Sequence, residues 1–360
     1  MTHPLFSIVI PAYNAADTIV PCLRALANQT VPRRRYEIIV VDDGSTDATA
    51  EVVQQFIRGE EAANSAPQPV IDPGGSSDPS SLLWGLSKLI RQSHQGAAVA
   101  RNTGAQKARA DIVLFLDADC VPERTWLERM TQALRQRNVA GVSGVVRTRQ
   151  TGLIPRFIQA EYDARYERIA QRAYIDFVSS GTAGYHRQAF AAVGGFATVL
   201  GGAEDVDLSF RLCDAGYRLV FKPGAVVYHS HPESLLAYAR RKFIYGYWRA
   251  RVYERHPQKV PSDSRTPLSQ KLQIALVPLI VLSLATSLAW SDCWYASAAL
   301  AGSFVLTTLP FVIRTLRRDP LVGLIAIPVT LASATAAAAG LMCGILQQRF
   351  LGRKLEGERL

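Results

Sequence analysis

"VLFLDADCVPE", residues 113–123, is the stretch on which the fold prediction depends. The apolar run from Val113 to Leu116 is followed by two carboxylates, Asp117 and Asp119, which are separated only by Ala118. Like charges at the end of a buried strand repel each other, and burying them without a cation is costly. The stretch therefore indicates either a strand that ends in water or a strand whose acidic end meets a cationic ligand.

The same arrangement of an apolar run and a polar end recurs through the first 230 residues. The segments "FSIVIPAYN" (6–14), "YEIIVVDDGSTD" (36–47) and "DIVLFLDAD" (111–119) are strand-like, and a segment with helical apolar spacing follows each of them. This alternation predicts an α/β fold with a doubly wound, mostly parallel sheet, which binds ligands at the carboxyl ends of its strands. Both acidic clusters stand at such ends.

The composition of the chain changes sharply near residue 271. Residues 272–346 are overwhelmingly apolar and contain three stretches, 272–290, 294–313 and 321–346, each long enough to span a membrane. Three buried helices of a soluble domain are the alternative. The net charge of +10 is compatible with nucleic acid or with an anionic membrane surface as the partner, and the apolar stretches favour the membrane surface. Five scattered cysteines without a CxxC pair indicate neither a disulfide framework nor a zinc site.

Charge also predicts the orientation of these stretches. With the first 270 residues in the cytoplasm and Lys271 inside, residues 314–319 ("RTLRRD") are inside as well, as the positive-inside rule requires. A third span would place Arg349 and Arg353 outside, against that rule. The third stretch, interrupted by Pro328, is therefore the one that could be re-entrant or lie in the interface. We expect a multi-pass protein of the plasma (inner) membrane without a signal peptide.

Each polar motif has a functional interpretation and a structural one. The carboxylates of Asp42 and Asp43 can fix a nucleotide base or ribose, or form a turn and helix cap. Asp117 and Asp119 suit Mg²⁺ or Mn²⁺, or are a solvated strand end.

Three further motifs leave the same choice open. Near a helix start, Glu204 and Asp205 can supply a general base, with Asp207 as the cap, or simply favour the helix dipole. Arg101 can bind phosphate or form a surface ion pair. His229 can be a metal ligand or a strand-end histidine.

The order of the motifs is more specific than any one of them. "IPAYN", "VVDDGSTD", "ARNTG", "FLDAD", "VGGF", "AEDVDLSFRL" and "PGAVVYH" occur in this order within residues 5–231. The set resembles the family-2 glycosyltransferases, which have the GT-A (nucleotide-diphospho-sugar transferase) fold. The resemblance is to membrane-anchored members that build exopolysaccharide or cell-surface glycans.

The resemblance implies a role for each candidate residue. It implies that Asp205 is the catalytic base and that Asp119 and His229 bind Mg²⁺ or Mn²⁺. It implies that the following residues bind the nucleotide-sugar donor or the acceptor: Pro11, Ala12, Tyr13, Asp42, Asp43, Arg101, Asp117 and Glu204.

The expected organisation has four parts. Residues 1–232 form the GT-A catalytic domain, with a flexible insert at 59–81, and residues 233–271 form a basic amphipathic juxtamembrane region. Residues 272–346 form the transmembrane helices, and residues 347–360 form a basic tail. The basic and aromatic segment 237–251 suits anionic headgroups or a polyprenyl-linked acceptor. A generic membrane anchor is the alternative.

The expected function is that of an inverting, metal-dependent glycosyltransferase. It moves a sugar from a nucleotide-diphosphate sugar to a hydroxyl of a lipid-linked or cell-surface glycan acceptor at the membrane. A processive polysaccharide synthase is one alternative, although residues 237–251 contain Trp248 but no QxxRW motif. A non-catalytic membrane scaffold with the GT-A fold is the other. Membrane lipids are expected partners, and nucleic acid is not.

Overall fold

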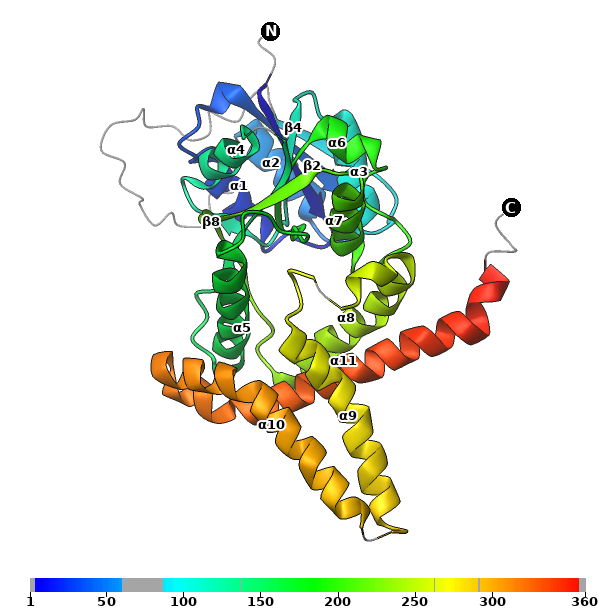
Figure 1. Ribbon diagram of the computed structural model, residues 1–360. Coiled ribbons are helices and arrows are strands. Elements are labelled where there is room, and N and C mark those ends of the chain that lie inside the picture. The colour runs from blue at the N-terminus through cyan, green and yellow to red at the C-terminus, as the bar shows by residue number, and fades with distance from the viewer. Residues whose placement is uncertain (1–3, 60–86, 137, 262, 291, 356–360) are drawn as a thin grey trace. The chain divides into compact units, whose positions relative to one another are not determined.

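The computed structural model describes residues 4–59, 87–136, 138–261, 263–290 and 292–355 (Figure 1). The chain forms two compact units, one from Met1–Arg147 with Ala173–His229 and one from Thr148–Arg172 with Ser230–Leu360. Residues 148–172, which the sequence analysis includes in the catalytic domain at 1–232, thus group with the second unit. The predicted insert at 59–81 lies, apart from Gly59, outside the described residues.

The first unit is built on one mixed sheet with strand order β3-β2-β1-β4-β7-β6-β8-β5 in the described residues. The strands β1 to β4 run parallel where they pair, β7 is antiparallel to β4 and β6, and β6 is parallel to β8. This architecture confirms the predicted doubly wound, mostly parallel sheet. The strands are Phe6–Ala12 (β1), Tyr36–Asp42 (β2), Ser87–Arg91 (β3), Ile112–Leu116 (β4), Val121–Pro122 (β5), Val139–Arg147 (β6), Thr182–His186 (β7) and Arg218–Tyr228 (β8).

The helices of the first unit pack against this sheet (Figure 1). On α2, for example, Val53 and Phe56 are buried at helical spacing, and Gly59 ends the helix with the positive φ that a C-terminal cap requires. The indole of Trp126 is fully buried and donates from Nε1 to Thr182 Oγ1 at 2.9 Å. The helices are Ile19–Ala27 (α1), Thr49–Arg58 (α2), Ala97–Lys107 (α3), Trp126–Leu134 (α4), Arg187–Ala192 (α6) and Glu204–Asp214 (α7).

The strand directions bring the polar ends of several strands to one edge. The adjacent strands β2, β1 and β4 are parallel, so the residues that follow Asp42, Ala12 and Leu116 lie at the same edge of the sheet. Two antiparallel pairings, β4 with β7 and β7 with β6, return β6 and β8 to that direction. His229, directly after β8, therefore belongs to this carboxyl edge as well.

The second unit is helical. Its helices are Leu153–Ala170 (α5), Leu235–Arg255 (α8), Leu268–Ser287 (α9), Cys293–Arg318 (α10) and Pro320–Leu355 (α11). The helix α5 belongs here because Phe157 and Ile158 are buried against Val322, Ala326 and other apolar residues of this unit.

Three helices of the second unit, α9, α10 and α11, are long and apolar enough to cross a membrane. Helices α10 and α11 contain the predicted stretches 294–313 and 321–346, whereas α9 ends at Ser287, before the predicted end at residue 290. Helix α11 continues through the first part of the predicted tail to Leu355. In Figure 1, α9 and α10 form an antiparallel hairpin, whereas α11 runs across its base. Half of the most apolar window of α11 is buried, against 11% for α9 and 22% for α10.

The close approach of α8 and α11 depends on three glycines. A Cβ atom on Gly340 would lie 2.0 Å from the carbonyl oxygen of Phe243, and one on Gly344 would lie 2.5 Å from that of Tyr247. On the facing helix, a Cβ on Gly246 would lie 2.2 Å from the carbonyl oxygen of Ala337. The backbones touch because these positions have no side chain, as in small-residue helix packing in membranes.

Candidate active site

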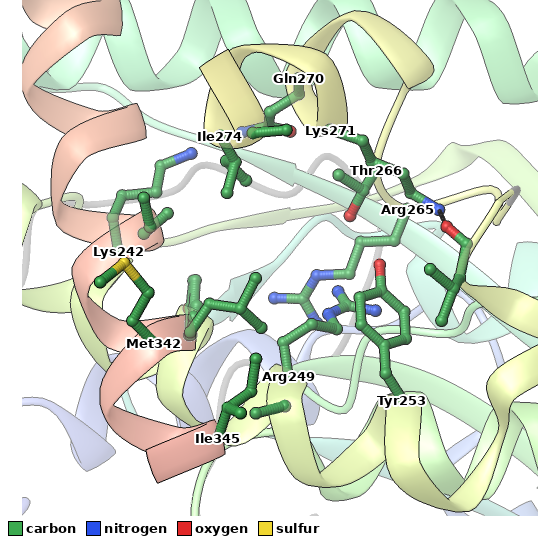
Figure 2. Close-up of a pocket in the computed structure, with 18 of the residues that line it drawn as sticks. Lys242, Arg249, Tyr253, Arg265, Thr266, Gln270, Lys271, Ile274, Met342 and Ile345 are labelled. Carbon is green, nitrogen blue, oxygen red and sulfur yellow. Dashed lines mark hydrogen bonds between the residues drawn. The ribbon is translucent and has the colours of Figure 1, made fainter. Parts of the chain in front are cut away.

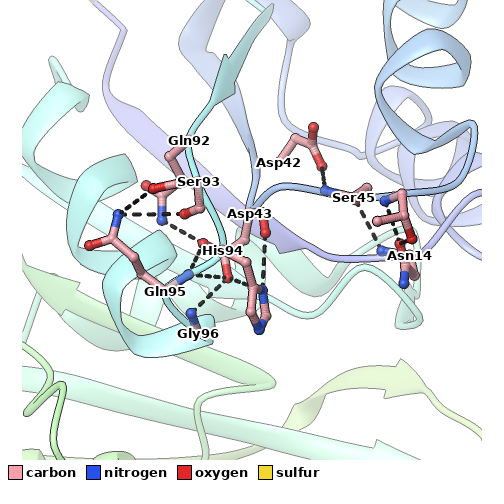
Figure 3. A network of polar contacts seen from close by, with 10 residues as sticks. Asn14, Asp42, Asp43, Ser45, Gln92, Ser93, His94, Gln95 and Gly96 are labelled. Atoms are coloured by element: carbon pink, nitrogen blue, oxygen red, sulfur yellow. Dashed lines mark hydrogen bonds and ion pairs between the residues drawn. The ribbon is translucent and has the colours of Figure 1, made fainter.

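The carboxylate of Asp43 holds together the loop that precedes α3 (Figure 3). It accepts hydrogen bonds from Gly96 N at 2.7 Å, Gln95 N at 3.0 Å and Gln92 Nε2 at 2.6 Å. His94 Nδ1 lies 3.0 Å from the same carboxylate. The side chain of Asp43 is only 2% exposed. In this structure Asp43 therefore organises residues 92–96, and any contact of this residue with a nucleoside remains a prediction.

The ring of His94 stacks on Tyr13, which follows β1. Their centroids are 4.1 Å apart, and about half of each side chain is exposed. Behind this pair, Asn14 Oδ1 accepts from Thr46 N at 2.9 Å, and Asn14 N donates to Ser45 Oγ at 3.0 Å. The loops after β1 and β2 are thereby fixed to each other, with Pro11 and Ala12 at the end of β1. The stacked pair is a ready surface for a planar ring.

Asp42 is fully buried at the end of β2. Its Oδ1 accepts from Ser45 N at 3.1 Å, which is the turn that the structural interpretation of this motif predicts. Its Oδ2 has no hydrogen-bond partner among the described residues, although Arg91 Nε lies 3.4 Å away. A buried acceptor without a partner is costly. The charge of Arg91 acts on this atom, and no hydrogen bond from the described residues competes with a ligand N–H there.

Arg101 joins two acids that are far apart in the sequence. Its Nη2 donates to Asp117 Oδ1 at 2.7 Å, and its Nη1 donates to Glu204 Oε1 at 2.9 Å. The side chain is 6% exposed, and its guanidinium lies 5.6 Å from the ring centroid of Phe196. Burial lowers the pKa of Arg101, but the charges of Asp117 and Glu204 raise it more. In this structure the guanidinium therefore fixes α3, the end of β4 and the start of α7 to one another.

The first turn of α7 carries three acids with different surroundings. Helix α7 begins at Glu204, and Asp207 is buried and paired with Arg211 at 2.8 Å. The expectation that Asp207 caps the helix and leaves Glu204 and Asp205 in a loop is therefore wrong, because Asp207 is needed for an i,i+4 ion pair. Burial, and then the charge of Asp205, raise the pKa of Glu204 against the lowering effect of Arg101. Asp205 Oδ2 accepts from Ser180 N at 3.4 Å.

Asp119 and His229 meet at the carboxyl edge. His229 Nε2 lies 3.2 Å from Asp119 Oδ2, and the two side chains are 24% and 47% exposed. Burial raises the pKa of Asp119, but the hydrogen bond to His229 and its charge outweigh this effect and lower it. Oxygens of Asp117 and Asp119 also lie within 4.8 Å of each other and of Cys120 Sγ.

These donors fit a hard divalent cation. Two carboxylates and one imidazole are ligands that Mg²⁺ or Mn²⁺ accepts. Burial, followed by the charges of Asp117 and Asp119, raises the pKa of the Cys120 thiol well above its usual value. Mg²⁺ and Mn²⁺ prefer oxygen ligands to a thiol, so the carboxylates suit such an ion better than Cys120 does.

Several residues of the site carry no motif that identifies them in the sequence. His94 and Gln92 lie beyond residues that look like a loop insert, and no motif points to them. Gly181 also belongs here, because a Cβ at this position would lie 2.8 Å from Asp117 Oδ2. The signal for Gly181 was the "SSGTAG" run at 179–184. A small residue before a strand end is consistent with close approach of a carboxylate.

Comparisons with known proteins identify the family and the fold of this chain. The sequence model of the family described as "Glycosyltransferase like family 2" matches residues 3–245. The chain is 32% identical to the glycosyltransferase AglE of Haloferax volcanii over 231 residues, which are 63% of this chain and 67% of AglE. It is 30% identical to the pre-mycofactocin glycosyltransferase of Mycobacterium tuberculosis over 267 residues, which are 72% of this chain but only 49% of that protein. The chain thus spans about half the length of the second relative.

Among solved structures, the mannosyltransferase PcManGT from Pyrobaculum calidifontis, in complex with GDP-Man and Mn²⁺, is similar with a TM-score of 0.59. The identity is 21%, and the match covers 97% of this chain and 88% of PcManGT. At this identity the likeness shows the fold alone. The match of the family over most of the first unit, together with the relationship to AglE, establishes that this chain belongs to glycosyltransferase family 2 and is a glycosyltransferase with a GT-A fold.

Proposed function

We propose that this enzyme transfers a sugar, with inversion, from a nucleotide-diphosphate sugar to a hydroxyl of a lipid-linked or cell-surface glycan acceptor at the membrane. The observation that carries the proposal is the bridge made by Arg101 between Asp117 and Glu204. The bridge holds Asp117, which we assign to binding of the nucleotide sugar, at a fixed position relative to the acidic start of α7. Asp205, the neighbour of Glu204, is the residue that we assign as the general base.

The assignment of Asp205 rests on its place in the "AEDVDLSFRL" motif, whose resemblance to the family implies a base at this position. Glu204 is engaged by Arg101, whose guanidinium is buried and shared with Asp117. Asp205 receives a long hydrogen bond of 3.4 Å from Ser180 N. Asp205 accepts the proton of the acceptor hydroxyl as that oxygen attacks the anomeric carbon. The bond from the anomeric carbon to the nucleoside diphosphate breaks on the opposite face, so a single displacement inverts the configuration.

Asp119 and His229, with Asp117 near them, would hold Mg²⁺ or Mn²⁺. When bound, such an ion supplies charge neutralisation for the leaving diphosphate. At the other side of the edge, Asp42 Oδ2 offers an acceptor and the Tyr13–His94 pair offers a stacking face. This set suits the base of the nucleotide. Asp43 accepts hydrogen bonds from Gln95 N and Gly96 N and thereby orders the loop that carries His94.

We further propose that only α9 and α10 cross the plasma membrane, with the catalytic unit in the cytoplasm. Two spans keep Lys271, Arg317 and Arg349 on one side, as the positive-inside rule favours. The helix α11 would then lie at the interface along α8. Labelling of a single cysteine at position 349 in intact cells tests this topology. An impermeant maleimide reaches it from outside only if α11 crosses the membrane.

Transfer assays with a panel of nucleotide sugars test the reaction itself. Membranes that contain the protein are assayed with and without Mn²⁺ or Mg²⁺, together with Asp205→Asn and a control, Asp214→Asn, at the exposed end of the same helix. Asp205→Asn should lose transfer and keep binding of the nucleotide sugar, and Asp214→Asn should keep both. Near-normal turnover in Asp205→Asn refutes the base assignment, and activity without a divalent ion refutes the metal assignment.

A further inference from the structure

The second unit contains a cavity of about 640 Å³ that the transfer reaction does not account for. Its wall is formed by residues of α5, α8, α9 and α11 and of the segment between α8 and α9. Figure 2 shows Lys242, Arg249 and Arg265 projecting into the space that Ile274, Met342 and Ile345 close from other sides. The cavity thus has a cationic part and an apolar part.

The cationic part has more positive than negative groups. Its charged wall residues are Arg165, Arg241, Lys242, Arg249, Arg265 and Lys271, against Glu161 and Glu254. Lys242 is paired with Glu161 at 3.1 Å, and Lys271 with Asp263 at 2.8 Å. The guanidinium carbons of Arg249 and Arg265 are 5.4 Å and 5.0 Å from the ring centroids of Tyr253 and Tyr245, and the charge of Arg249 also acts on Asp263.

Two buried donors of the wall lack hydrogen-bond partners among the described residues. These are Arg241 Nε and Gln348 Nε2. Leaving a buried donor without a partner has a free-energy cost, and several guanidinium groups around one space favour an anion with several oxygens, above all a phosphate. The polar part of the cavity is therefore complementary to a phosphate group.

The apolar part is complementary to a hydrocarbon chain. It is formed by Ile274 and Pro278 of α9 and by Leu341, Met342 and Ile345 of α11, which belong to helices apolar enough to cross a membrane. Met342 and Ile345 are 50% and 41% exposed. A free phosphate ion would use none of this surface. A lipid with a phosphate headgroup would use both parts at once.

We propose that this cavity binds an anionic, phosphate-bearing lipid, with its headgroup among Arg241, Arg249 and Arg265 and its chain along α9 and α11. The site lies wholly within the second unit, so lipid binding does not depend on the sugar or on the base assigned above. The lipid chemistry includes both anionic glycerophospholipids and isoprenyl phosphates, and the experiment separates these two sources.

Native mass spectrometry of the full-length protein in a neutral detergent tests this site. The probes are phosphatidylglycerol, an isoprenyl monophosphate, phosphatidylcholine and inorganic phosphate, each titrated separately. We expect bound lipid with the first or the second probe, and the tighter of the two identifies the source. Arg241→Gln combined with Arg249→Gln should weaken that binding by at least about tenfold, because two charge-assisted contacts are lost.

The adjacent residue Arg240 supplies the matched control, because it is exposed on the same helix and does not line the cavity. Arg240→Gln should leave lipid binding unchanged. A second variant, Met342→Asp, should weaken lipid binding while the thermal unfolding of the protein stays as in the wild type. The proposal is overturned if phosphatidylcholine or inorganic phosphate binds as tightly as both anionic lipids, or if Arg240→Gln weakens binding as much as the double variant.

Discussion

His229 Nε2 lies 3.2 Å from Asp119 Oδ2, although one residue follows β8 and the other follows β4. The sheet makes this meeting possible, because β8 and β4 run in the same direction and end at the same edge. The pair also explains why two acids can stand one residue apart in "LDAD". Although burial disfavours its charge, the pKa of Asp119 is lowered by His229, so the carboxylate is ionised at neutral pH.

The first prediction concerns this pair. Replacement of His229 by Gln removes the imidazole that we propose as a metal ligand but keeps a polar side chain of similar length. We expect the Mn²⁺ concentration for half-maximal transfer to rise by at least about tenfold, since even supporting groups of a metal site contribute this much. His186→Gln is the control, because His186 ends β7 and its Nε2 contacts Leu134 O. An unchanged Mn²⁺ dependence in His229→Gln would remove this residue from the metal site.

The second prediction concerns Arg101. Arg101→Gln leaves Asp117 and Glu204 without the guanidinium that both of them contact. The free energy of unfolding at pH 7 should fall by about 3 kcal/mol, the typical effect of removing one partner of a buried ion pair. Arg101→Lys keeps the charge but cannot contact both carboxylates as the guanidinium does. Its free energy of unfolding should therefore fall by less than that of Arg101→Gln. Denaturant titrations of the three proteins at pH 7 measure these differences.

The same variant has a predicted pH dependence. The pKa of Glu204 is already raised in the folded protein by burial and by Asp205, and the loss of Arg101 should raise it further. A group whose folded pKa exceeds its unfolded value binds a proton on folding, so folding is favoured as the pH falls. The deficit of Arg101→Gln relative to the wild type should therefore shrink between pH 7 and pH 5. A constant deficit would contradict the electrostatic role of the bridge.

The carboxyl edge could be predicted from the sequence, but the partners within it could not. Asp42, Asp117 and Asp119 each follow a strand that the apolar runs identify, and parallel strands bring such ends together. Pairings between distant segments leave no local signal. Arg101 illustrates the limit: "ARNTG" indicates an arginine near phosphate, whereas the folded chain buries it between two carboxylates.

Two other features could not be predicted from the sequence: the role of the loop that Asp43 organises, and the unit to which α5 belongs. The loop follows β3, which comes directly after a stretch with the composition of an insert, so neither His94 nor Gln92 could be assigned to the site. Helix α5 has an apolar pattern, but a pattern does not identify the surface that it meets. Burial of Phe157 among apolar residues of the second unit decides this.

The third prediction concerns the contact between α8 and α11. Gly340→Leu places a side chain where even a Cβ atom would lie 2.0 Å from the carbonyl oxygen of Phe243. The helices must separate, and the stability of the second unit should fall by about 3 kcal/mol or more, at the upper end for overpacked sites. Gly302→Leu on α10 is the matched control, because a Cβ at Gly302 meets nothing within 4 Å.

Thermal unfolding in detergent compares these two glycine variants with the wild type. Gly302→Leu should unfold at the wild-type temperature or above it, since glycine is a poor helix former. Gly340→Leu should unfold at a lower temperature. Equal unfolding temperatures for the two variants would show that the backbone contact of α8 with α11 contributes little to stability.

The last prediction concerns Glu37, at the amino end of β2 and thus away from the carboxyl edge. Its buried carboxylate accepts from Ser7 Oγ at 2.7 Å and from Arg109 N and Nε at 2.7 Å and 2.9 Å. Burial raises the pKa of Glu37, but these hydrogen bonds and the charge of Arg109 together lower it below its usual value. In Glu37→Gln an amide NH₂ group replaces one carboxylate oxygen and faces the N–H or O–H groups that donated to it. The free energy of unfolding should therefore fall by about 2 kcal/mol at pH 7.

The sign of the pH effect is opposite to that for Arg101→Gln. A carboxylate whose folded pKa is below its unfolded value of about 4.3 stabilises the fold above that value, and this contribution is lost as the pH falls through the folded pKa. The difference in the free energy of unfolding between wild type and Glu37→Gln should thus be largest at pH 7 and should become smaller below about pH 4. Glu51→Gln, at an exposed position of α2, should show no such difference. If the Glu37→Gln deficit stays constant into the acid range, the cause is lost packing rather than lost charge.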